Sequence, residues 1–145
     1  MTSSETPRLA GRCVCGAVRF SGTPKEAHMD ACHCSICRRW SAGPFMSVNC
    51  PDLTVEGEDG LATYASSEHA ERQFCKTCGS TLFWRMKDGS MIAVSAQAFD
   101  DPSGFPLATE IFVDEKPVTY DFANATTKMT GAEVIAAFAG SNADG

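Results

Sequence analysis

The sequence lacks the features that place a protein in a membrane or on a nucleic acid. No apolar run in its 145 residues is long enough to span a bilayer, and its first residues contain no apolar stretch of the kind a secretory signal needs. Basic residues are not clustered either: Arg38 and Arg39 form the one dense basic pair, in a chain whose formal charge is −6. Because binding to a phosphate backbone depends on clustered Lys and Arg, we expect no membrane and no nucleic-acid partner.

Internal repeats, long low-complexity tracts and interdomain linkers are missing as well. A chain of this length falls within the usual range for one domain and buries roughly 70% of the surface that its unfolded form exposes. We therefore predict a single domain over residues 9–139, with a disordered N-terminus at residues 1–8 and a flexible C-terminus at residues 140–145. The composition says nothing about the oligomeric state.

Helix signals are scarce, and short segments that alternate apolar and polar residues dominate the chain, as in half-buried strands. These segments are 12–20, 45–50, 61–64, 71–75, 81–86, 91–98 and 109–113. An Asp88-Gly89 pair separates two of them and is typical of a hairpin turn. The pattern predicts a mainly β protein built from antiparallel sheets.

Two short helices are expected. The first covers residues 35–40. The second is predicted by Thr130 and Glu133, which have the spacing of a capping box ahead of Val134, Ile135 and Phe138. We expect this short C-terminal helix to pack on a face of the sheet.

The sequence has eight cysteines, more than a hydrophobic core requires. They must form disulfides, bind metal or react as thiols. Without a secretory signal we expect a cytoplasmic location, where thiols stay reduced and cysteine-rich chains usually bind metal. Seven of the eight fall into closely spaced groups, which favours zinc over disulfides or inert core thiols.

Two of these groups together predict a closed, structural zinc site. Cys13 and Cys15 fall within a predicted strand, where alternate side chains share a face, so both sulfurs should point the same way. Cys75 and Cys78 form a C-x2-C turn followed by Gly79, a residue that tolerates the positive φ such turns often require. Four thiolates complete a tetrahedral zinc site and would connect the first strand to a hairpin about sixty residues later.

The third group, Cys32, Cys34 and Cys37, supplies three ligands within six residues. Zinc sites with three protein ligands and an open fourth position belong to the catalytic class. Spacing alone also permits Cys50 to complete this site. We favour the three-ligand arrangement, because Cys50 ends a predicted strand beside Pro51 and suits a small buried apolar position.

The residues around the third group suggest further roles. In an extended segment His33 faces away from Cys32 and Cys34, which favours a place behind the ligands or at the surface over ligation. Arg38 and Arg39 directly follow the third cysteine and could hold a substrate carboxylate. Surface positions are expected for His28 and His69, and core positions, or an aromatic wall beside the open site, for Trp40, Phe45, Phe83 and Trp84.

Together the motifs resemble the glutathione-dependent formaldehyde-activating enzyme family, whose domain also occurs in centromere protein V. The resemblance runs in order from Gly11 to Leu82 and more weakly to Asp121. Its motifs are Gly11-x-Cys13-x-Cys15-Gly16-x-Val18-x-Phe20, Cys32-His33-Cys34-Ser35-Ile36-Cys37-Arg38, Ser66-Ser67 and Arg72-x-Phe74-Cys75-x2-Cys78-Gly79-Ser80-x-Leu82.

The resemblance implies a β-tent fold, a structural zinc on Cys13, Cys15, Cys75 and Cys78, and a labile second zinc on Cys32, Cys34 and Cys37, which would also be the catalytic residues. The implied activity is that of a carbon–sulfur lyase, written as the condensation of formaldehyde with glutathione to S-(hydroxymethyl)glutathione. A zinc-held glutathione thiolate would attack the carbonyl carbon.

The chain departs from the family in its C-terminal part. Many members place His where this chain has Glu110, and a Lys-Ala-Pro-Trp segment where it has Lys116-Pro117-Val118-Thr119-Tyr120. The pocket is therefore expected to differ, which leaves the physiological thiol and aldehyde open. The alternative function is a zinc-stapled, non-catalytic interaction or metal-binding module. A pocket reaching a three-thiolate site would favour the enzyme, and a fourth protein ligand would favour the module.

Overall fold

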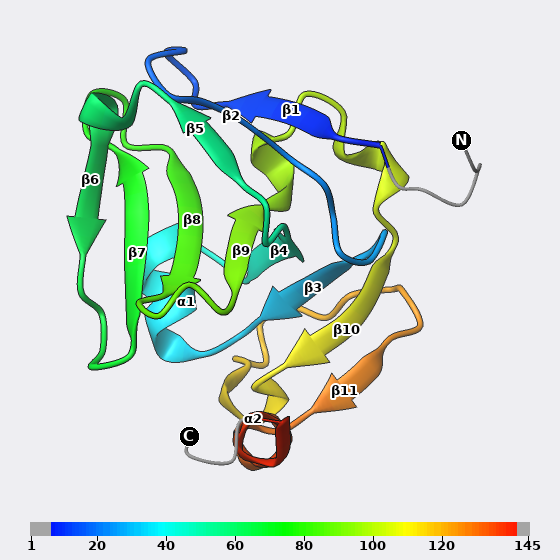
Figure 1. Ribbon diagram of the computed structural model, residues 1–145. Coiled ribbons are helices and arrows are strands. Elements are labelled where there is room, and N and C mark those ends of the chain that lie inside the picture. Colours follow the sequence, from blue (N-terminus) through cyan, green and yellow to red (C-terminus); the bar gives the residue numbers. More distant parts are fainter. Residues whose placement is uncertain (1–6, 142–145) are drawn as a thin grey trace. The chain divides into compact units, whose positions relative to one another are not determined.

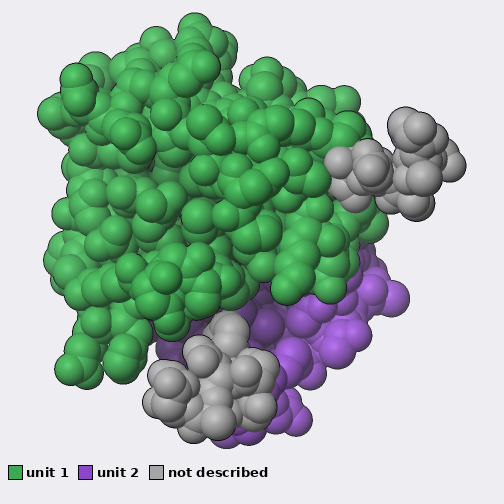
Figure 2. Space-filling model, viewed as in Figure 1, with its two compact units in different colours: residues 1–28, 47–106 green, residues 29–46, 107–145 purple. Residues whose placement is uncertain are grey.

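The computed structural model describes residues 7–141 and divides the chain into two compact units (Figures 1 and 2). The first unit consists of residues up to His28 together with Ser47–Pro106, and the second of Met29–Met46 together with the chain from Leu107 onward. The single domain predicted over residues 9–139 stays a prediction. Among the described residues, no helix is both long enough and apolar enough to cross a membrane.

The first unit is built from antiparallel strand pairs. One sheet has the order β1-β2-β5, formed by β1 (Leu9–Arg12), β2 (Arg19–Gly22) and β5 (Thr54–Glu56). The other pairs follow the order β4-β9-β8-β7-β6, of which β7, β8 and β9 lie side by side in Figure 1. Their bounds are β4 (Phe45–Asn49, which begins in the second unit), β6 (Leu61–Tyr64), β7 (Ala70–Cys75), β8 (Thr81–Met86) and β9 (Ile92–Ser95).

Aromatic rings fill the core of this unit. Phe20 contacts Phe83 and Phe99 edge to face, with ring centroids 5.3 and 5.2 Å apart, and Phe99 also packs on Phe105 at 5.2 Å. Each such pair adds roughly 0.5–1.5 kcal/mol beyond the burial of its area. The core therefore connects β2 and β8 to the segment after β9, which contains the short 3-10 helices η2 (Ala96–Ala98) and η3 (Pro102–Gly104).

The second unit pairs its strands in parallel. β10 (Leu107–Ile111) lies between β3 (Met29–Cys32) and β11 (Thr127–Met129) and is parallel to both. Parallel strands require a long crossover between them, and here the chain leaves the second unit after Met46 and returns at Leu107. The unit also contains α1 (Ser35–Ser41), the 3-10 helix η4 (Val113–Glu115) and α2 (Gly131–Ser141); the remaining 3-10 helix, η1 (Glu58–Gly60), belongs to the first unit.

The mainly β prediction is confirmed, together with both helices. The hairpin turn between β8 and β9 forms as expected, with Gly89 at a φ of 80°. The capping box forms reciprocally: Thr130 N–H donates to Glu133 Oε1 at 2.7 Å and Glu133 N–H donates to Thr130 Oγ1 at 3.2 Å. Val134 of α2 is buried and Ile135 is 62% exposed, whereas the side chain of Phe138 lies outside the described residues.

Three expectations need correction. Residues 12–20 do not form one strand, because the chain turns between β1 and β2 with Gly16 at a φ of +82°. The antiparallel prediction fails in the second unit. Strands β3, β5 and β11 were not predicted, because they are short and their apolar alternation is weak. Of the termini predicted to be flexible, Arg8 is bound to Asp52 at 2.9 Å, and residues 1–6 and 142–145 lie outside the described residues.

Replacing Gly57 by Ala should destabilise the first unit much more than replacing Gly89 by Ala. Both glycines have a φ of 80°, so both substitutions carry the same left-handed backbone cost of roughly 1–2 kcal/mol. A Cβ on Gly57 would lie 2.1 Å from the carbonyl oxygen of Ala17, whereas a Cβ on Gly89 would meet nothing within 4 Å. Denaturant unfolding of the two variants measures the difference. Equal losses of unfolding free energy would contradict the close packing of Gly57 against Ala17.

Candidate metal centres

Two turns in the first unit bring Cys13, Cys15, Cys75 and Cys78 together, as predicted. These four residues are called the first group from here on. Cys13 and Cys15 lie in the turn after β1, Cys75 ends β7, and Cys78 lies in the turn before β8. The four Sγ atoms lie within 4.8 Å of one another. The reason given for the first pair was wrong: the sulfurs of Cys13 and Cys15 converge because the backbone turns, not because a strand alternates its faces.

Both turns have a similar construction. Gly16 N–H donates to the carbonyl of Cys13 at 3.2 Å, and Gly79 N–H donates to that of Cys75 at 2.7 Å. Gly16 and Gly79 have φ values of 82° and 79°, which a residue with a Cβ adopts only at a cost. In each turn a backbone N–H also points at the first sulfur, from Val18 to Cys13 at 3.3 Å and from Cys78 to Cys75 at 3.5 Å. The turns thus stabilise negative charge on these sulfurs.

The distances in this group fit a tetrahedral zinc site. The Sγ atoms of Cys13 and Cys15 lie 3.7 Å apart, as do those of Cys15 and Cys75. Four thiolates at about 2.3 Å from one zinc ion would have sulfurs about 3.8 Å apart. None of the cysteines forms a disulfide. A hydrogen bond with the Ser80 hydroxyl, 3.2 Å away, is the main factor that lowers the pKa of Cys78 to about 5, so this thiol ionises readily.

The second unit brings Cys32, Cys34 and Cys37 together around the start of α1. These three residues are called the second group from here on. Cys32 ends β3, Cys34 is the N-cap of the helix and Cys37 lies in its first turn. Their Sγ atoms lie within 4.8 Å of one another, and among the described residues no further Cys, His, Asp or Glu joins this group. The Cys34 sulfur accepts the backbone N–H of Cys37 at 3.3 Å, so it acts as the helix cap.

Proton sharing within the three thiols is unequal. Hydrogen bonds with Cys32 and Cys37 lower the pKa of Cys34, while hydrogen bonds with Cys34 and Cys37, together with burial, raise the pKa of Cys32. Of the two, Cys34 therefore loses its proton more readily, and Cys32 retains its proton more strongly. Binding of a metal cation would remove that difference, because thiol ligands bind in the deprotonated form.

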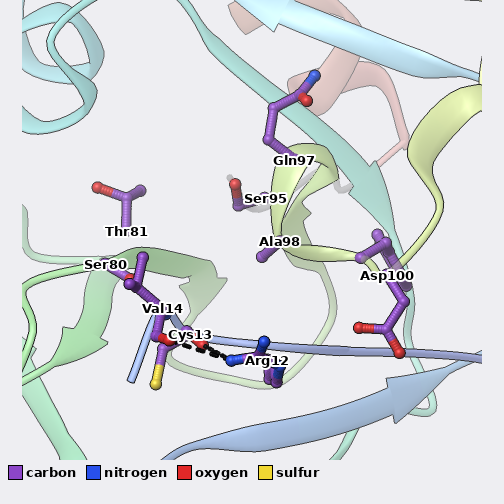
Figure 3. Close-up of a pocket in the computed structure, with 10 residues that line it drawn as sticks. Arg12, Cys13, Val14, Ser80, Thr81, Ser95, Gln97, Ala98 and Asp100 are labelled. Carbon is purple, nitrogen blue, oxygen red and sulfur yellow. Dashed lines mark hydrogen bonds between the residues drawn. The ribbon is translucent and has the colours of Figure 1, made fainter. Parts of the chain in front are cut away.

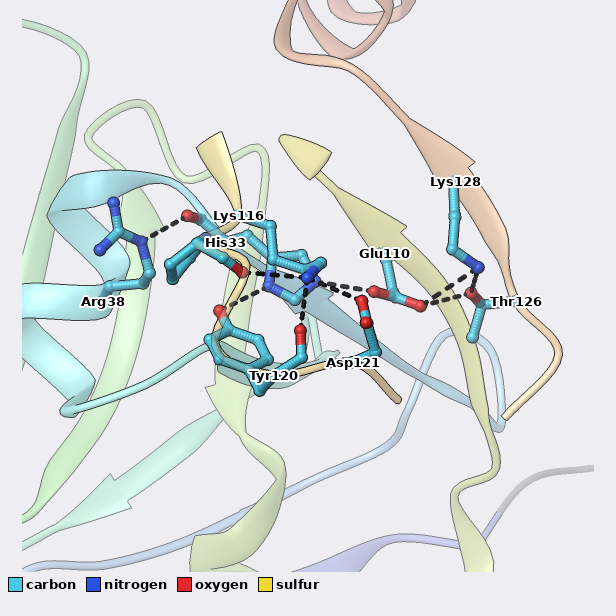
Figure 4. A network of polar contacts seen from close by, with 9 residues as sticks. His33, Arg38, Glu110, Lys116, Tyr120, Asp121, Thr126 and Lys128 are labelled. Carbon is cyan, nitrogen blue, oxygen red and sulfur yellow. Dashed lines mark hydrogen bonds and ion pairs between the residues drawn. The ribbon is translucent and has the colours of Figure 1, made fainter. Parts of the chain in front are cut away.

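His33, between the first two of these cysteines, is the centre of a polar network (Figure 4). It is fully buried, so it faces away from solvent, and it is not among the converging ligand atoms. Nε2 lies 2.8 Å from Glu110 Oε1, and Nδ1 lies 2.9 Å from the Tyr120 hydroxyl. The alternative surface position is therefore wrong, and the place of His33 behind metal ligands stays a prediction.

Glu110 is buried at 1% exposure and anchors this network. Its Oε2 accepts the Thr126 hydroxyl at 2.6 Å and lies 3.6 Å from Lys128 Nζ. Burial by itself would raise the pKa of Glu110, but the hydrogen bonds with Thr126 and His33 outweigh it and keep the pKa below its usual value. An ionised carboxylate only accepts, so His33 Nε2 carries a proton and, in the neutral ring, Nδ1 accepts the Tyr120 hydroxyl.

Sequence reasoning did not find this network. The contacts of His33 span 77 residues to Glu110 and 87 residues to Tyr120, which no local pattern reveals. The feature of the sequence that pointed to these residues is the departure from the family pattern at Glu110 and in residues 116–120. Lys116 fixes Tyr120 as well, since it donates to the Tyr120 carbonyl and lies 5.1 Å from the centre of its ring.

The other predicted residues are placed as follows. Arg38 is half-buried and its Nε donates to the carbonyl of His33 at 3.0 Å, whereas Arg39 is exposed; their role toward a substrate stays a prediction. Cys50 is fully buried in the first unit and belongs to neither cysteine group, and burial raises its pKa to about 12. The core prediction holds for Phe45 and Phe83, while Trp40 and Trp84 are half-buried; His69 is exposed and His28 is half-buried.

A cavity of about 500 Å³ adjoins the first cysteine group within the first unit (Figure 3). Polar side chains predominate in its lining, which consists of Arg12, Cys13, Val14, Ser80, Thr81, Ser95, Gln97, Ala98, Phe99 and Asp100. Arg12 Nη1 donates to the carbonyls of Cys13 and Val14 at 3.1 and 3.0 Å, and Val14 N–H donates to Ser80 Oγ at 3.0 Å. These bonds hold the first turn beside Ser80, which also contacts Cys78.

Comparison with known proteins connects both cysteine groups to one family. The model of the glutathione-dependent formaldehyde-activating enzyme family matches residues 8–115, a stretch that includes both cysteine groups, His33 and Glu110 but not Tyr120. An uncharacterized lyase of Schizosaccharomyces pombe is 35% identical over 131 residues, which cover 89% of this chain and 96% of that protein.

Two further matches are shorter. A Halomonas elongata protein, provisionally named a glutathione-dependent formaldehyde-activating enzyme, is 34% identical over 85 residues, covering 52% of this chain and 54% of that protein. A Rhodobacter sphaeroides protein of known crystal structure superposes with a TM-score of 0.58 at 25% identity, covering 69% of this chain and 100% of that one.

Replacing Cys75 by Ser should remove one equivalent of zinc and unfold the first unit. Structural zinc contributes on the order of 10–16 kcal/mol in small domains, as much as the roughly 5–15 kcal/mol that keeps a domain folded. Cys50→Ala is the matched control: it removes a buried thiol outside both groups, should lower stability by about 1 kcal/mol and should retain all bound zinc. Metal analysis with thermal melting tests both variants. A Cys75→Ser protein with the wild-type melting curve would contradict the assignment.

Replacing Cys34 should remove zinc from the second group and leave the first group loaded. Cys34→Ser keeps an acceptor at the helix N-cap, while Cys34→Ala removes ligand and cap together and should cost about 1 kcal/mol more. Zinc content and denaturant unfolding separate the two effects. Loss of zinc from both groups in Cys34→Ser would show that the sites are not independent.

Proposed function

Because the chain belongs to the glutathione-dependent formaldehyde-activating enzyme family, we propose that it is a zinc-dependent carbon–sulfur lyase acting on the adduct of glutathione, or a related small thiol, with a small aldehyde. In the synthetic direction the thiol sulfur forms a bond to the aldehyde carbon. The thiol loses its proton and the carbonyl oxygen gains one, which gives a hydroxymethyl thioether. The reverse reaction breaks the same carbon–sulfur bond.

The observation that carries this proposal is the second cysteine group. Three sulfurs within 4.8 Å of one another suit a zinc ion, and three thiolates are one ligand fewer than a closed structural site has. Zinc held there supplies a positive charge that lowers the pKa of an incoming thiol and polarises a carbonyl. The first group, with four sulfurs, is the closed counterpart and has a structural role.

The residues of this chain prepare the second group for that chemistry. Hydrogen bonds with the thiols of Cys32 and Cys37, and to a smaller extent with the backbone N–H of Cys37, lower the pKa of Cys34, which favours its thiolate form. Arg38 and Arg39 provide cationic groups for the carboxylates of glutathione. The bond from Arg38 Nε to His33 uses one of the five N–H groups of the guanidinium, and it fixes the base of this side chain.

The family's description supports glutathione and formaldehyde as the first substrates to test. We place the activity in the cytoplasm, because free cysteine ligands and small thiols stay reduced there. Glu110 and Tyr120 differ from the family pattern described above, and this difference supports a specificity that includes other thiols or aldehydes.

Glutathione should bind saturably to the zinc-loaded protein, with one site per chain, as measured by calorimetry. Arg39→Gln should weaken binding by about tenfold, the effect of losing a charge-assisted hydrogen bond. Arg19→Gln is the matched control, because it removes the same charge from an exposed position in the first unit and should bind normally.

Turnover is measured by NMR exchange between formaldehyde, glutathione and their adduct. Binding without faster exchange would keep the thiol site and point to another aldehyde. Absence of binding at full zinc occupancy would refute the lyase and leave the non-catalytic zinc module.

A further inference from the structure

His33 is the single residue between Cys32 and Cys34 of the second group, and its backbone N–H, its carbonyl and both ring nitrogens have hydrogen-bond partners. Its N–H donates to the carbonyl of Ile111 at 3.0 Å, and its own carbonyl accepts Arg38 Nε at 3.0 Å. The ring nitrogens contact Glu110 and Tyr120. A residue with 0% exposure and four such bonds has very little freedom to move.

Immobilising His33 also immobilises its neighbours. Cys34 has an extended backbone, with φ of −63° and ψ of 156°, and Cys32 ends a strand. In extended chain successive side chains point to opposite sides, so a ring fixed on one side sets the direction of both neighbouring sulfurs on the other. The distance between the sulfurs of Cys32 and Cys34 thus depends on where the ring is held.

The partners of the ring are themselves fixed within the second unit. β10 pairs with β3 so that Glu110 lies opposite Ala31, and Thr126 and Lys128 hold the second oxygen of its carboxylate. Tyr120 is held by Lys116, and its ring lies 5.5 Å from that of His33. The series of hydrogen bonds that runs from Glu110 through His33 to Tyr120 is therefore held at both ends (Figure 4).

We propose that Glu110 and Tyr120 are positioning residues, which act through the His33 ring to set the geometry of Cys32 and Cys34 and thereby the affinity of the second group for its metal. The inference rests on the proposed function only in requiring that these cysteines bind zinc. Tyr120 lies outside the stretch that the family model matches. Loss of a hydrogen bond that orients a metal ligand typically weakens metal binding by about 10–100-fold, and we expect the lower end of that range here, because His33 acts on the neighbouring cysteines through the backbone.

The test uses full-length protein loaded with zinc in both groups. Stepwise competition with a chelator gives a dissociation constant for each group in the same sample. Tyr120→Phe keeps the ring and removes one hydroxyl, and should weaken the second group by about tenfold or more while the first group keeps its affinity. Tyr64→Phe, which removes the hydroxyl of an exposed tyrosine in the first unit, should change neither value.

A second pair of variants separates positioning from stability. Glu110→Gln retains an acceptor for His33 Nε2 and should keep the affinity within a few fold of wild type. Glu110→Leu has a similar volume but no acceptor, and the second group of this variant should bind zinc more weakly. Its visible absorption spectrum should also change when cobalt(II) replaces zinc in the second group. A general loss of stability would not change the ratio of the two dissociation constants or the cobalt spectrum. Should Glu110→Leu not fold, Tyr120→Phe decides alone.

The outcomes distinguish this inference from the proposed function. Wild-type second-group affinity in folded Tyr120→Phe and Glu110→Leu would overturn the positioning role and leave the lyase proposal standing. Failure of the wild-type protein to bind zinc at the second group would overturn both. A selective loss at the second group that Glu110→Gln avoids would support the positioning role.

Discussion

The structure of the first unit depends on four cysteine sulfurs converging from two turns that are about sixty residues apart in the chain. Closing a loop of that length costs conformational entropy. Contacts between neutral thiols 3.7 Å apart contribute little stabilising free energy to offset that cost. A tetrahedrally coordinated cation would offset this free-energy cost, because it would stabilise four thiolates at that same spacing. The turn after β1 and the hairpin of β7 and β8 are then joined at one point, with Ser80 and Arg12 supporting the turns around it.

The two cysteine groups are built in opposite ways. In the first, the sulfurs come from distant segments, but each turn is supported by its own backbone hydrogen bonds and by a glycine with positive φ. In the second, the sulfurs lie within six residues, but the support comes from far along the chain, from Ile111, Glu110 and Tyr120. A metal in the first group would therefore be coupled to folding, whereas a metal in the second could be bound and released without closing the fold of its unit.

This difference matches the functions that we propose for the two groups. A closed set of four ligands resists exchange, which suits a structural site. A set of three ligands on a strand end and a helix N-terminus would leave room for a substrate sulfur, and in our proposal its affinity for the metal depends on residues that do not touch the metal. Glu110 illustrates this: at the level of sequence it is only a departure from a family pattern, and in the structure it is the buried acceptor that holds the His33 ring.

The sequence alone was enough to predict the Cys13/Cys15 and Cys75/Cys78 pairs, the Cys32, Cys34 and Cys37 cluster, the Asp88-Gly89 hairpin and the capping box of α2, because each depends on residues a few positions apart and on the local chemistry of Cys, Gly, Thr and Glu. Only the tertiary structure decided that Cys13 and Cys15 meet in a turn, since a strand and a turn both place such sulfurs on one side. It also decided the parallel pairing of β10 and the partners of His33. The side-chain contacts of His33 join residues that are 77 and 87 positions apart, and their formation depends on the competition among all possible pairings, which no short stretch of sequence records.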